Sequence, residues 1–285
     1  MLRSGCLQGH RSQFGFLFNT LPRMKNSSLA IAALSLLFST SATWAQSAPA
    51  KLILSEDFES TAVGEIPQGF TKSGMVGVVD DVAHSGKKSL RMDPVVRGAR
   101  KIIKSGPEMD AIGGEHWGRL YYKVKLPPPT PTIPEGKTSG IIHSTLVSGQ
   151  ATSPLASDAI EVRLLGNILN MNGTFKYLYN VQPKMRKEFG VSAKASNHFA
   201  EDWTLIEWYV SNATQSYRFF VNGEEIPEMA IKKGEGQFEG VEIPAKFENL
   251  SFGWTNYQPA NGEGFTAWID DLALAKERIG PTAKK

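Results

Sequence analysis

The sequence predicts an all-β fold, a two-sheet antiparallel β-sandwich that spans residues 46–285. Short alternating or apolar runs recur along this part of the chain, separated by Gly, Pro, Asn and Asp, which is the pattern of strands and turns. Helical patterns are few, and neither an internal repeat nor a coiled-coil heptad is present. Many short strands with few helices indicate a sandwich or a barrel.

Ten segments have the composition of strands. The segment 203–211 is dense in apolar residues, as a strand buried on both faces would be. Asn222-Gly223 supplies the two residues with positive φ that a type I′ turn needs, so a hairpin is predicted around it. The predicted strands are 51–58, 89–94, 117–126, 139–147, 159–165, 175–180, 203–211, 217–221, 247–254 and 266–275.

Three segments are predicted as loops. The run 127–134 contains five prolines, which have no N–H for a sheet ladder, so it cannot be a central strand. Residues 182–200 and 227–246 are long, polar and mixed in composition. We expect both to cross the surface of the sandwich, with no more than a helical turn.

The N-terminal 45 residues have the parts of a secretory signal peptide. A basic start at Lys25 precedes the apolar run 29–38, and small residues lead to a cleavage site at Ala45. The apolar run is shorter than the roughly 20 residues that span a bilayer as a helix. We expect translation to start at Met24 and cleavage to leave residues 46–285 as one periplasmic or secreted domain without a transmembrane anchor.

Export should therefore leave a chain that begins near Gln46. Intact-mass measurement of the protein recovered from the periplasm or the medium checks this expectation. Exported material that still carries its first 45 residues would contradict it.

Charge and cysteine content exclude several function classes. The leader carries four of the 31 basic residues and none of the 28 acidic ones, so the rest of the chain has a net charge of −1. A nucleic-acid-binding domain needs a strongly basic surface, and none is predicted. The single cysteine, Cys6, lies in the leader, which excludes a disulfide or a thiolate metal site in the domain. We expect the domain to be a monomer.

The two ends of the domain carry a pattern known from other secreted proteins. Phe58-Glu59 and His84-Ser-Gly-Lys-Lys88 stand near its start, and Phe252-Gly-Trp254 and Ala267-Trp-Ile-Asp-Asp271 near its end. These motifs resemble the concanavalin-like jelly rolls of secreted carbohydrate-active proteins. The resemblance is greatest to a cellulose-induced fungal secreted protein and its relatives, a group similar in fold to glucuronan and alginate lyases. It covers nearly the whole domain but is loose over about 127–200.

The resemblance implies a structural Ca²⁺ that ties the first strand to the last. Its ligand positions match Glu59, Ser85, Lys88 and Asp270, with Lys88 able to contribute only its backbone carbonyl. Ca²⁺ takes six to eight hard oxygen ligands and mixes carboxylates with carbonyls. In the alternative interpretation, Glu59 and Asp270 are exposed acids at strand ends.

A sheet face that bears His, Arg, Asn and Tyr suits a lyase that removes the proton α to a uronate carboxylate. Strand alternation places Ile141, His143 and Thr145 on one face, and Glu161 and Arg163 on one face of the next strand. In this hypothesis Arg163 neutralises the carboxylate and His143 removes the proton. Alternatively, Glu161 and Arg163 form an ion pair and His143 is a core histidine.

Two further roles complete the hypothesis. Asn167 stands where the resembled proteins have a carboxylate-neutralising Gln, close to a bulge predicted at Gly166-Asn167. Tyr177 or Tyr179, which share a strand face, would protonate the leaving oxygen, unless both simply pack in the sheet.

Sugar binding is assigned to aromatic and amide side chains. Trp254 and Tyr257 follow a predicted strand and can stack on sugar rings, although a large aromatic such as Trp254 is more commonly part of a core. Asn170 and Asn172 are assigned as further substrate contacts.

The leading hypothesis is thus a secreted polysaccharide lyase that cleaves a uronate-containing glycan by β-elimination. The first alternative is a non-catalytic carbohydrate-binding jelly roll stabilised by calcium. The second is an envelope structural protein that binds another protein through a sheet face. Converging His, Arg and Tyr side chains would favour the lyase, whereas a binding module needs only exposed aromatic rings.

Overall fold

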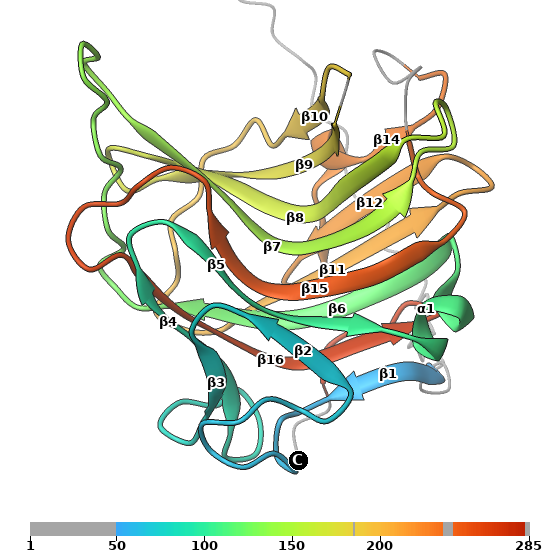
Figure 1. Cartoon of the computed structure of the whole chain (residues 1–285), viewed down its shortest axis with the longest axis horizontal. Helices are drawn as coiled ribbons and strands as arrows, with labels where there is room; N and C mark the ends of the chain where they lie inside the picture. The colour runs from blue at the N-terminus through green and yellow to red at the C-terminus, as the bar shows by residue number, and fades with distance from the viewer. Residues whose placement is uncertain (1–49, 185, 236–241, 283–285) are drawn as a thin grey trace, which may run out of the picture. The chain divides into compact units, whose positions relative to one another are not determined.

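The computed structural model describes residues 50–184, 186–235 and 242–282, all of which lie in one compact unit, Ser47–Lys285. The predicted signal peptide and its cleavage site fall outside the described residues. The described part contains two antiparallel sheets that pack face to face (Figure 1), as the sequence predicts.

Sheet A has the order β13-β12-β11-β6-β16-β4-β3, with β1 also paired to β16 and β14 to β12. The first and last strands of the fold are therefore neighbours, since Leu54 pairs with Leu274. The strands are β1 (Leu52–Glu56), β3 (Val76–Val79), β4 (Ser89–Val95), β6 (Glu115–Val124), β11 (Thr204–Ser211), β12 (Ser216–Val221), β13 (Glu224–Glu225), β14 (Ile231–Lys232) and β16 (Phe265–Ala275).

Sheet B has the order β10-β9-β8-β7-β15-β5-β2 and faces the viewer in Figure 1, with β10 at the top. Its strands are β2 (Phe70–Ser73), β5 (Gly98–Ser105), β7 (Ile141–Thr152), β8 (Ala159–Asn170), β9 (Phe175–Pro183), β10 (Phe189–Ser192) and β15 (Phe247–Asn256). The helices are short: α1 (Pro107–Ile112) and the 3-10 turn η1 (Pro227–Met229).

The core lies between the two sheets and is filled by alternate residues of each strand. Trp208 of sheet A and Trp254 of sheet B are both fully buried in it. Fully burying one such apolar side chain contributes about 1.5–3 kcal/mol, and more than forty buried residues belong to this cluster. The domain can therefore be stable without a disulfide.

All ten predicted strands are present, with ends shifted by a few residues. The hairpin is also confirmed: Asn222 and Gly223 have φ of 50° and 87°, and Val221 pairs with Glu224. Strands β2, β3 and β5 were not predicted, and β10 and β14 interrupt the segments predicted as loops. In β5 the alternation of apolar and polar residues is broken in the sequence, because an arginine occupies one of the buried positions. The Arg100 guanidinium is buried there and donates hydrogen bonds to the carbonyls of Asp93 and Phe265.

Three neighbouring strands of sheet B carry irregularities at the same level. The registers shift at Phe252–Thr255 of β15, Thr145–Val147 of β7 and Arg163–Gly166 of β8. Gly253 has a φ of 148°, and a Cβ there would lie 2.3 Å from the Arg100 carbonyl oxygen. Bulges bend strands and increase their twist. The three irregularities lie side by side across β15, β7 and β8.

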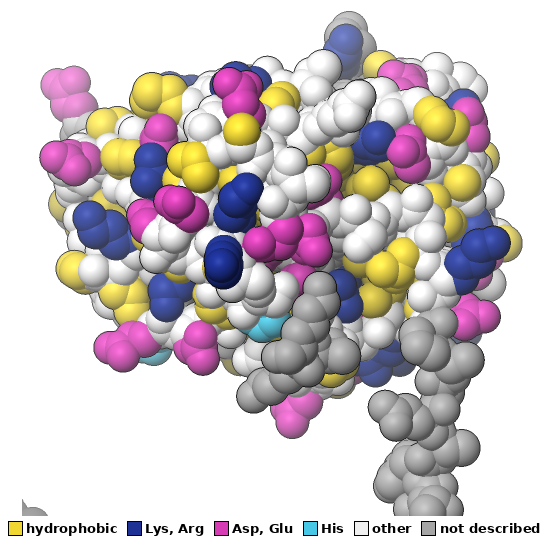
Figure 2. Space-filling model, turned by 90° about the horizontal axis from the view of Figure 1, so that it is seen from below, with side chains coloured by type: hydrophobic (Ala, Val, Ile, Leu, Met, Phe, Trp, Pro, Cys, Tyr) yellow, Lys and Arg dark blue, Asp and Glu magenta, His cyan; other side chains and the backbone are white. Residues whose placement is uncertain are grey.

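The surface drawn in Figure 2 shows no patch of one charge. On its described part, Lys and Arg side chains are interspersed with Asp and Glu ones. This face is thus unlike the concentrated basic surface that nucleic acids require. Within the described residues, no helix has the length and apolarity needed to cross a membrane.

Candidate functional site

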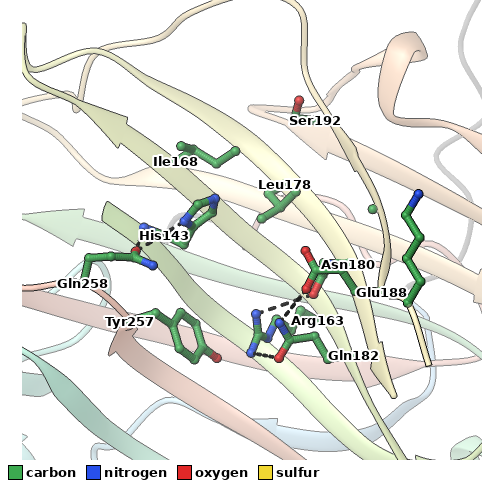
Figure 3. Close-up of a pocket in the computed structure, with 12 residues that line it drawn as sticks. His143, Arg163, Ile168, Leu178, Asn180, Gln182, Glu188, Ser192, Tyr257 and Gln258 are labelled. Carbon is green, nitrogen blue, oxygen red and sulfur yellow. Dashed lines mark hydrogen bonds between the residues drawn. The ribbon is translucent and has the colours of Figure 1, made fainter. Parts of the chain in front are cut away.

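A groove of about 660 Å³ lies on the outer face of sheet B. Strands β7, β8 and β9 form its floor, the loop before β10 forms one wall, and the end of β15 forms the other (Figure 3). The groove is lined by His143, Arg163, Ile168, Leu178, Asn180, Gln182, Lys187, Glu188, Gly190, Ser192, Tyr257 and Gln258.

His143 is held in one orientation by Gln258. The backbone N–H of His143 donates to Gln258 Oε1 at 2.7 Å, and Nδ1 lies 3.3 Å from the same oxygen. An amide oxygen only accepts, so Nδ1 is the donor in this contact, and in the neutral ring Nε2 is then the acceptor. This tautomer presents a proton acceptor on the groove-lining imidazole.

Arg163 is buried, with its guanidinium at the floor of the groove. Its Nε donates to Glu161 at 3.1 Å, and its terminal nitrogens contact Gln182 and, at 3.5 Å, Asn180. The ion pair that the sequence allowed between Glu161 and Arg163 is therefore present. A guanidinium has five N–H donors, so two of them remain for a ligand after these contacts with described residues.

Tyr257 stands beside both groups. Its ring lies under the guanidinium of Arg163, 4.0 Å from centroid to Cζ, and its N–H donates to the His143 carbonyl at 3.0 Å. Burial raises the pKa of the Tyr257 phenol, and the nearby charge of Glu161 adds to the rise. One face of the Tyr257 ring is covered by Arg163, so the ring is not a free stacking platform, and its hydroxyl points toward Arg163 and Gln182 (Figure 3).

Tyr177 and Tyr179 do not reach the groove. Both are buried in the core, where Tyr177 shares a hydrogen bond of 2.9 Å with Tyr122 and Tyr179 packs on Tyr217. Burial raises the pKa of both phenols. The prediction that either one is the acid of the groove is wrong, because this face of β9 points toward sheet A.

Asn167 and Trp254 are also core residues. Asn167 pairs with Tyr177 on the inner face of β8, because the irregularity after Arg163 reverses the alternation. Trp254 is fully buried, donates to Asn256 at 2.8 Å and stacks on Phe265. Neither side chain can touch a ligand in the groove, so their predicted roles are wrong.

Asn170 and Asn172 lie at a second, shallower hollow at the β8–β9 turn, with Ile141 and Ser196 among its lining residues. Asn172 Oδ1 accepts hydrogen bonds from Thr174 N–H and Oγ1, which closes the turn. Neither asparagine lines the groove itself.

Asn180, Gln182 and Gln258 line the groove and were not predicted. Asn180 and Gln182 share one face of β9 with Leu178, at every second position, and this face is opposite to that of Tyr177. Their spacing of two residues was the available signal. Gln258 directly follows Tyr257 in the sequence, but no sequence motif or periodicity marks it as a groove residue.

A second site lies where β1 approaches β16, and it contains all four predicted calcium ligands. We call it the junction and define it as Glu59, the loop 84–88, Asp270 and Asp271. Glu59 Oε1 accepts from the N–H groups of Lys87 and Lys88 at 2.8 and 2.7 Å. Asp270 Oδ2 accepts from the N–H groups of His84 and Ser85 at 2.8 and 3.3 Å. One loop therefore holds both carboxylates.

Asp270 has no cationic partner among the described residues. It is fully buried, and burial followed by the charge of Asp271 raises its pKa to about 7. Asp271 is paired with His84 Nδ1 at 2.6 Å, and the Lys88 ammonium binds the carbonyls of Glu59 and Thr61. A buried carboxylate without a counter-charge fits a bound cation.

The donor set also suits calcium. Among the described residues, no group of three or more His, Cys, Asp and Glu side chains could hold a metal. An ion here must therefore combine the carboxylates of Glu59 and Asp270 with backbone carbonyls, as Ca²⁺ does. Lys88 can contribute only its backbone carbonyl, whereas Ser85 has both a carbonyl and a hydroxyl oxygen, which keeps its lone pairs while it donates to Asp271.

The fold has solved counterparts. The structure described as "Cellulose induced protein, Cip1" is 16% identical and covers 80% of this chain and 100% of its own, with a TM-score of 0.50. The receptor binding domain of botulinum neurotoxin mosaic serotype C/D is 13% identical with a TM-score of 0.49; the match covers 80% of this chain and 48% of that one.

The binding domain of Paraclostridial Mosquitocidal Protein 1 is 13% identical with a TM-score of 0.47, and the match covers 80% of this chain and 49% of that one. This chain thus spans about half the length of the toxin domains. No family model matches the sequence, and no curated protein does. At these identities the likeness concerns the fold alone: the chain is a jelly-roll sandwich of two antiparallel sheets, similar in fold to the cellulose-induced protein.

Proposed function

We propose that this protein is a secreted polysaccharide lyase that cleaves a uronate-containing glycan by β-elimination. The observation that carries the proposal is that His143, Arg163 and Tyr257 line one open groove. The reaction needs a cation beside the uronate carboxylate, a base for the C5 proton and an acid for the leaving oxygen. The groove contains one group of each kind.

The proposed reaction balances without an external reactant. His143 Nε2 accepts the C5 proton, the electron pair of that bond forms the C4–C5 double bond, and the C4–O bond breaks. The Tyr257 hydroxyl donates its proton to the departing oxygen. A raised pKa keeps this phenol protonated, which an acid requires. Arg163 stabilises the charge that builds up on the carboxylate as the C5 proton leaves.

The groove supports a polymeric substrate, because an open groove suits a chain that extends beyond the reacting sugar. We expect the protein to act outside the cytoplasm, as a monomer.

A non-catalytic carbohydrate-binding module is the second candidate. One observation favours it: the Arg163 guanidinium is already paired with Glu161, which lowers its net attraction for a uronate carboxylate. Incubation with glucuronan, alginate and pectate separates the two candidates. A lyase produces unsaturated ends that absorb ultraviolet light, whereas a binding module retains the polymer and produces none.

Tyr257→Phe tests the acid. The change removes the hydroxyl and keeps the ring under Arg163, so turnover should fall by about 10²-fold or more, the scale of general acid catalysis, while polymer affinity stays near that of the wild type. Initial rates and a binding isotherm measure both quantities. If Tyr257 only stacks against a sugar, the phenylalanine variant will keep its turnover. Tyr209→Phe, on sheet A, is the matched control.

We also propose that Ca²⁺ binds at the junction through Glu59, Asp270, Ser85 and the backbone carbonyl of Lys88. The unpaired, buried Asp270 supports this assignment. The ion would be structural, since it joins the loop 84–88 to the first and last strands. Binding to the native state alone adds stability by linkage.

A further inference from the structure

Two buried serines lie beside Arg163 on neighbouring strands of sheet B. Ser148 of β7 pairs with Ser251 of β15 on one side and with Arg163 of β8 on the other. Only 2% of Ser148 and 4% of Ser251 are exposed, and neither is among the described residues that line the groove. Burying a hydroxyl costs free energy unless it is hydrogen-bonded. Both serines therefore need partners within the protein.

The hydrogen bonds of this pair run in one direction. Ser148 Oγ donates to Glu161 Oε1 at 2.9 Å, because an ion-paired carboxylate can only accept. A hydroxyl has one hydrogen, so Ser251 must be the donor in the 2.9 Å contact between the two serines. The Lys101 ammonium of β5 lies 3.4 Å from Ser251 Oγ, to which it donates. Lys101, Ser251 and Ser148 thus form a chain of donors that ends at Glu161, which we call the serine relay.

Glu161 connects the serine relay to Arg163. Its two oxygens have separate partners, since Oε1 accepts from Ser148 and Oε2 accepts from Arg163 Nε at 3.1 Å. Bonds to both oxygens fix the plane of the carboxylate and hence the direction from which it accepts the Arg163 N–H. The far end of the guanidinium contacts Gln182, whose Nε2 donates to Glu188 at 2.7 Å. The guanidinium is thus held at both ends.

We infer that Ser148, supported by Ser251, is a positioning residue that acts through Glu161 to direct the free N–H groups of Arg163 into the groove. The inference rests on the proposed function and deepens it, because it names what orients the proposed cation. A donor that is already oriented stabilises developing charge without reorganising during the reaction. Loss of the serine relay should therefore lower kcat and leave KM nearly unchanged.

Ser148→Ala tests the inference, and Ser89→Ala is the matched control. Ser89, on sheet A, is fully buried and donates to the Val82 carbonyl, so each change removes one buried hydroxyl and its hydrogen bond. Both variants should melt at lower temperatures than the wild type. On a uronate polymer only Ser148→Ala should lower kcat, by about tenfold, the scale of one hydrogen bond to a charged group.

Glu161→Gln examines the link between Ser148 and Arg163. An amide has one acceptor oxygen where a carboxylate has two, so this variant cannot accept from both neighbours. Its kcat should fall, while loss of the negative charge beside Arg163 should strengthen polymer binding. If Ser148 acts through Glu161, adding Ser148→Ala to Glu161→Gln should lower kcat no further, so the two effects should be strongly non-additive.

The NMR signal of the Arg163 Nε–H gives a measurement that needs no turnover, and its loss in Arg163→Ala assigns it. We expect the signal to shift in Ser148→Ala and to stay in place in Ser89→Ala. Equal kcat in the two serine variants, or a full further loss in the double variant, would refute the role of Ser148 and leave the lyase standing. If the wild type yields no unsaturated ends, the lyase fails, and an unshifted signal in Ser148→Ala would refute the positioning of Arg163 as well.

Discussion

Arg163→Ala should lower turnover on a uronate polymer by about 10²–10³-fold, the usual effect of removing one electrostatic contact made in the transition state. The carboxylate gains negative charge as the C5 proton leaves, so the cation contributes more to the transition state than to the ground state. Affinity should therefore fall much less than turnover. The initial rate at which ultraviolet absorbance rises gives the turnover, and a separate binding isotherm gives the affinity.

His143→Ala should abolish detectable turnover, because no other described residue that lines the groove carries an imidazole. Gln258→Ala should have an intermediate effect, since it frees the imidazole from the tautomer that keeps Nε2 unprotonated. Arg218→Ala is the matched control: that arginine is paired with Glu225 on sheet A. Melting curves exclude unfolding as the cause.

A binding module would behave differently. It would yield no unsaturated product from glucuronan, alginate or pectate and would respond little to His143→Ala. If the wild-type protein binds one of these polymers yet produces no unsaturated ends, the lyase is refuted and the binding module remains.

Without calcium, the protein should lose stability as the pH rises from about 4 to above 7, and the cause should be Asp270. Its pKa is raised to about 7 by burial, then by Asp271, so the folded protein keeps a proton that the unfolded chain releases near its ordinary value of 3.8. A carboxyl with a raised folded pKa therefore stabilises at low pH, and this contribution disappears as the pH passes through 7. Three pH units correspond to about 4 kcal/mol as an upper bound.

Calcium should reverse this loss. Bound Ca²⁺ favours the ionised carboxylate, so excess calcium should raise the melting temperature strongly at pH 8 and weakly at pH 5, where protons compete for Asp270. Asp270→Asn should remove both the pH dependence and the calcium response, because the amide cannot ionise. Asp110→Asn, an exposed acid paired with Lys246, should keep both. Equal melting temperatures at pH 8 in chelator and in calcium would refute the site.

Strand alternation predicted which residues share a face but not which face is inside. His143 and Arg163 both reach the groove, as the spacing in their strands indicates. On β9 the same rule grouped Tyr177 with Tyr179, yet the groove takes Leu178, Asn180 and Gln182. A tyrosine suits either side of a sheet, because its ring is apolar and its hydroxyl polar. Only the packing of sheet B on sheet A determines the choice.

A bulge makes residue spacing along a strand unreliable as a guide to which face a side chain occupies. The resemblance implied that Asn167 lies beside Arg163, where related proteins have a Gln, but the register shift between Arg163 and Gly166 turns its side chain into the core. One extra residue reverses every side chain beyond it. The sequence indicated a bulge near Gly166 but not its effect on Asn167.

By itself, the sequence determined the all-β class, ten of the strands and the Asn222-Gly223 hairpin, since these depend on local periodicity and turn chemistry. Together with the resemblance it also predicted that Glu59 and Asp270, at opposite ends of the domain, meet. Tertiary structure alone decided the groove: Tyr257 and Gln258 reach His143 from more than a hundred residues away, because β15 lies beside β7. Such contacts depend on strand order and on aligned bulges in three strands, which no local pattern encodes.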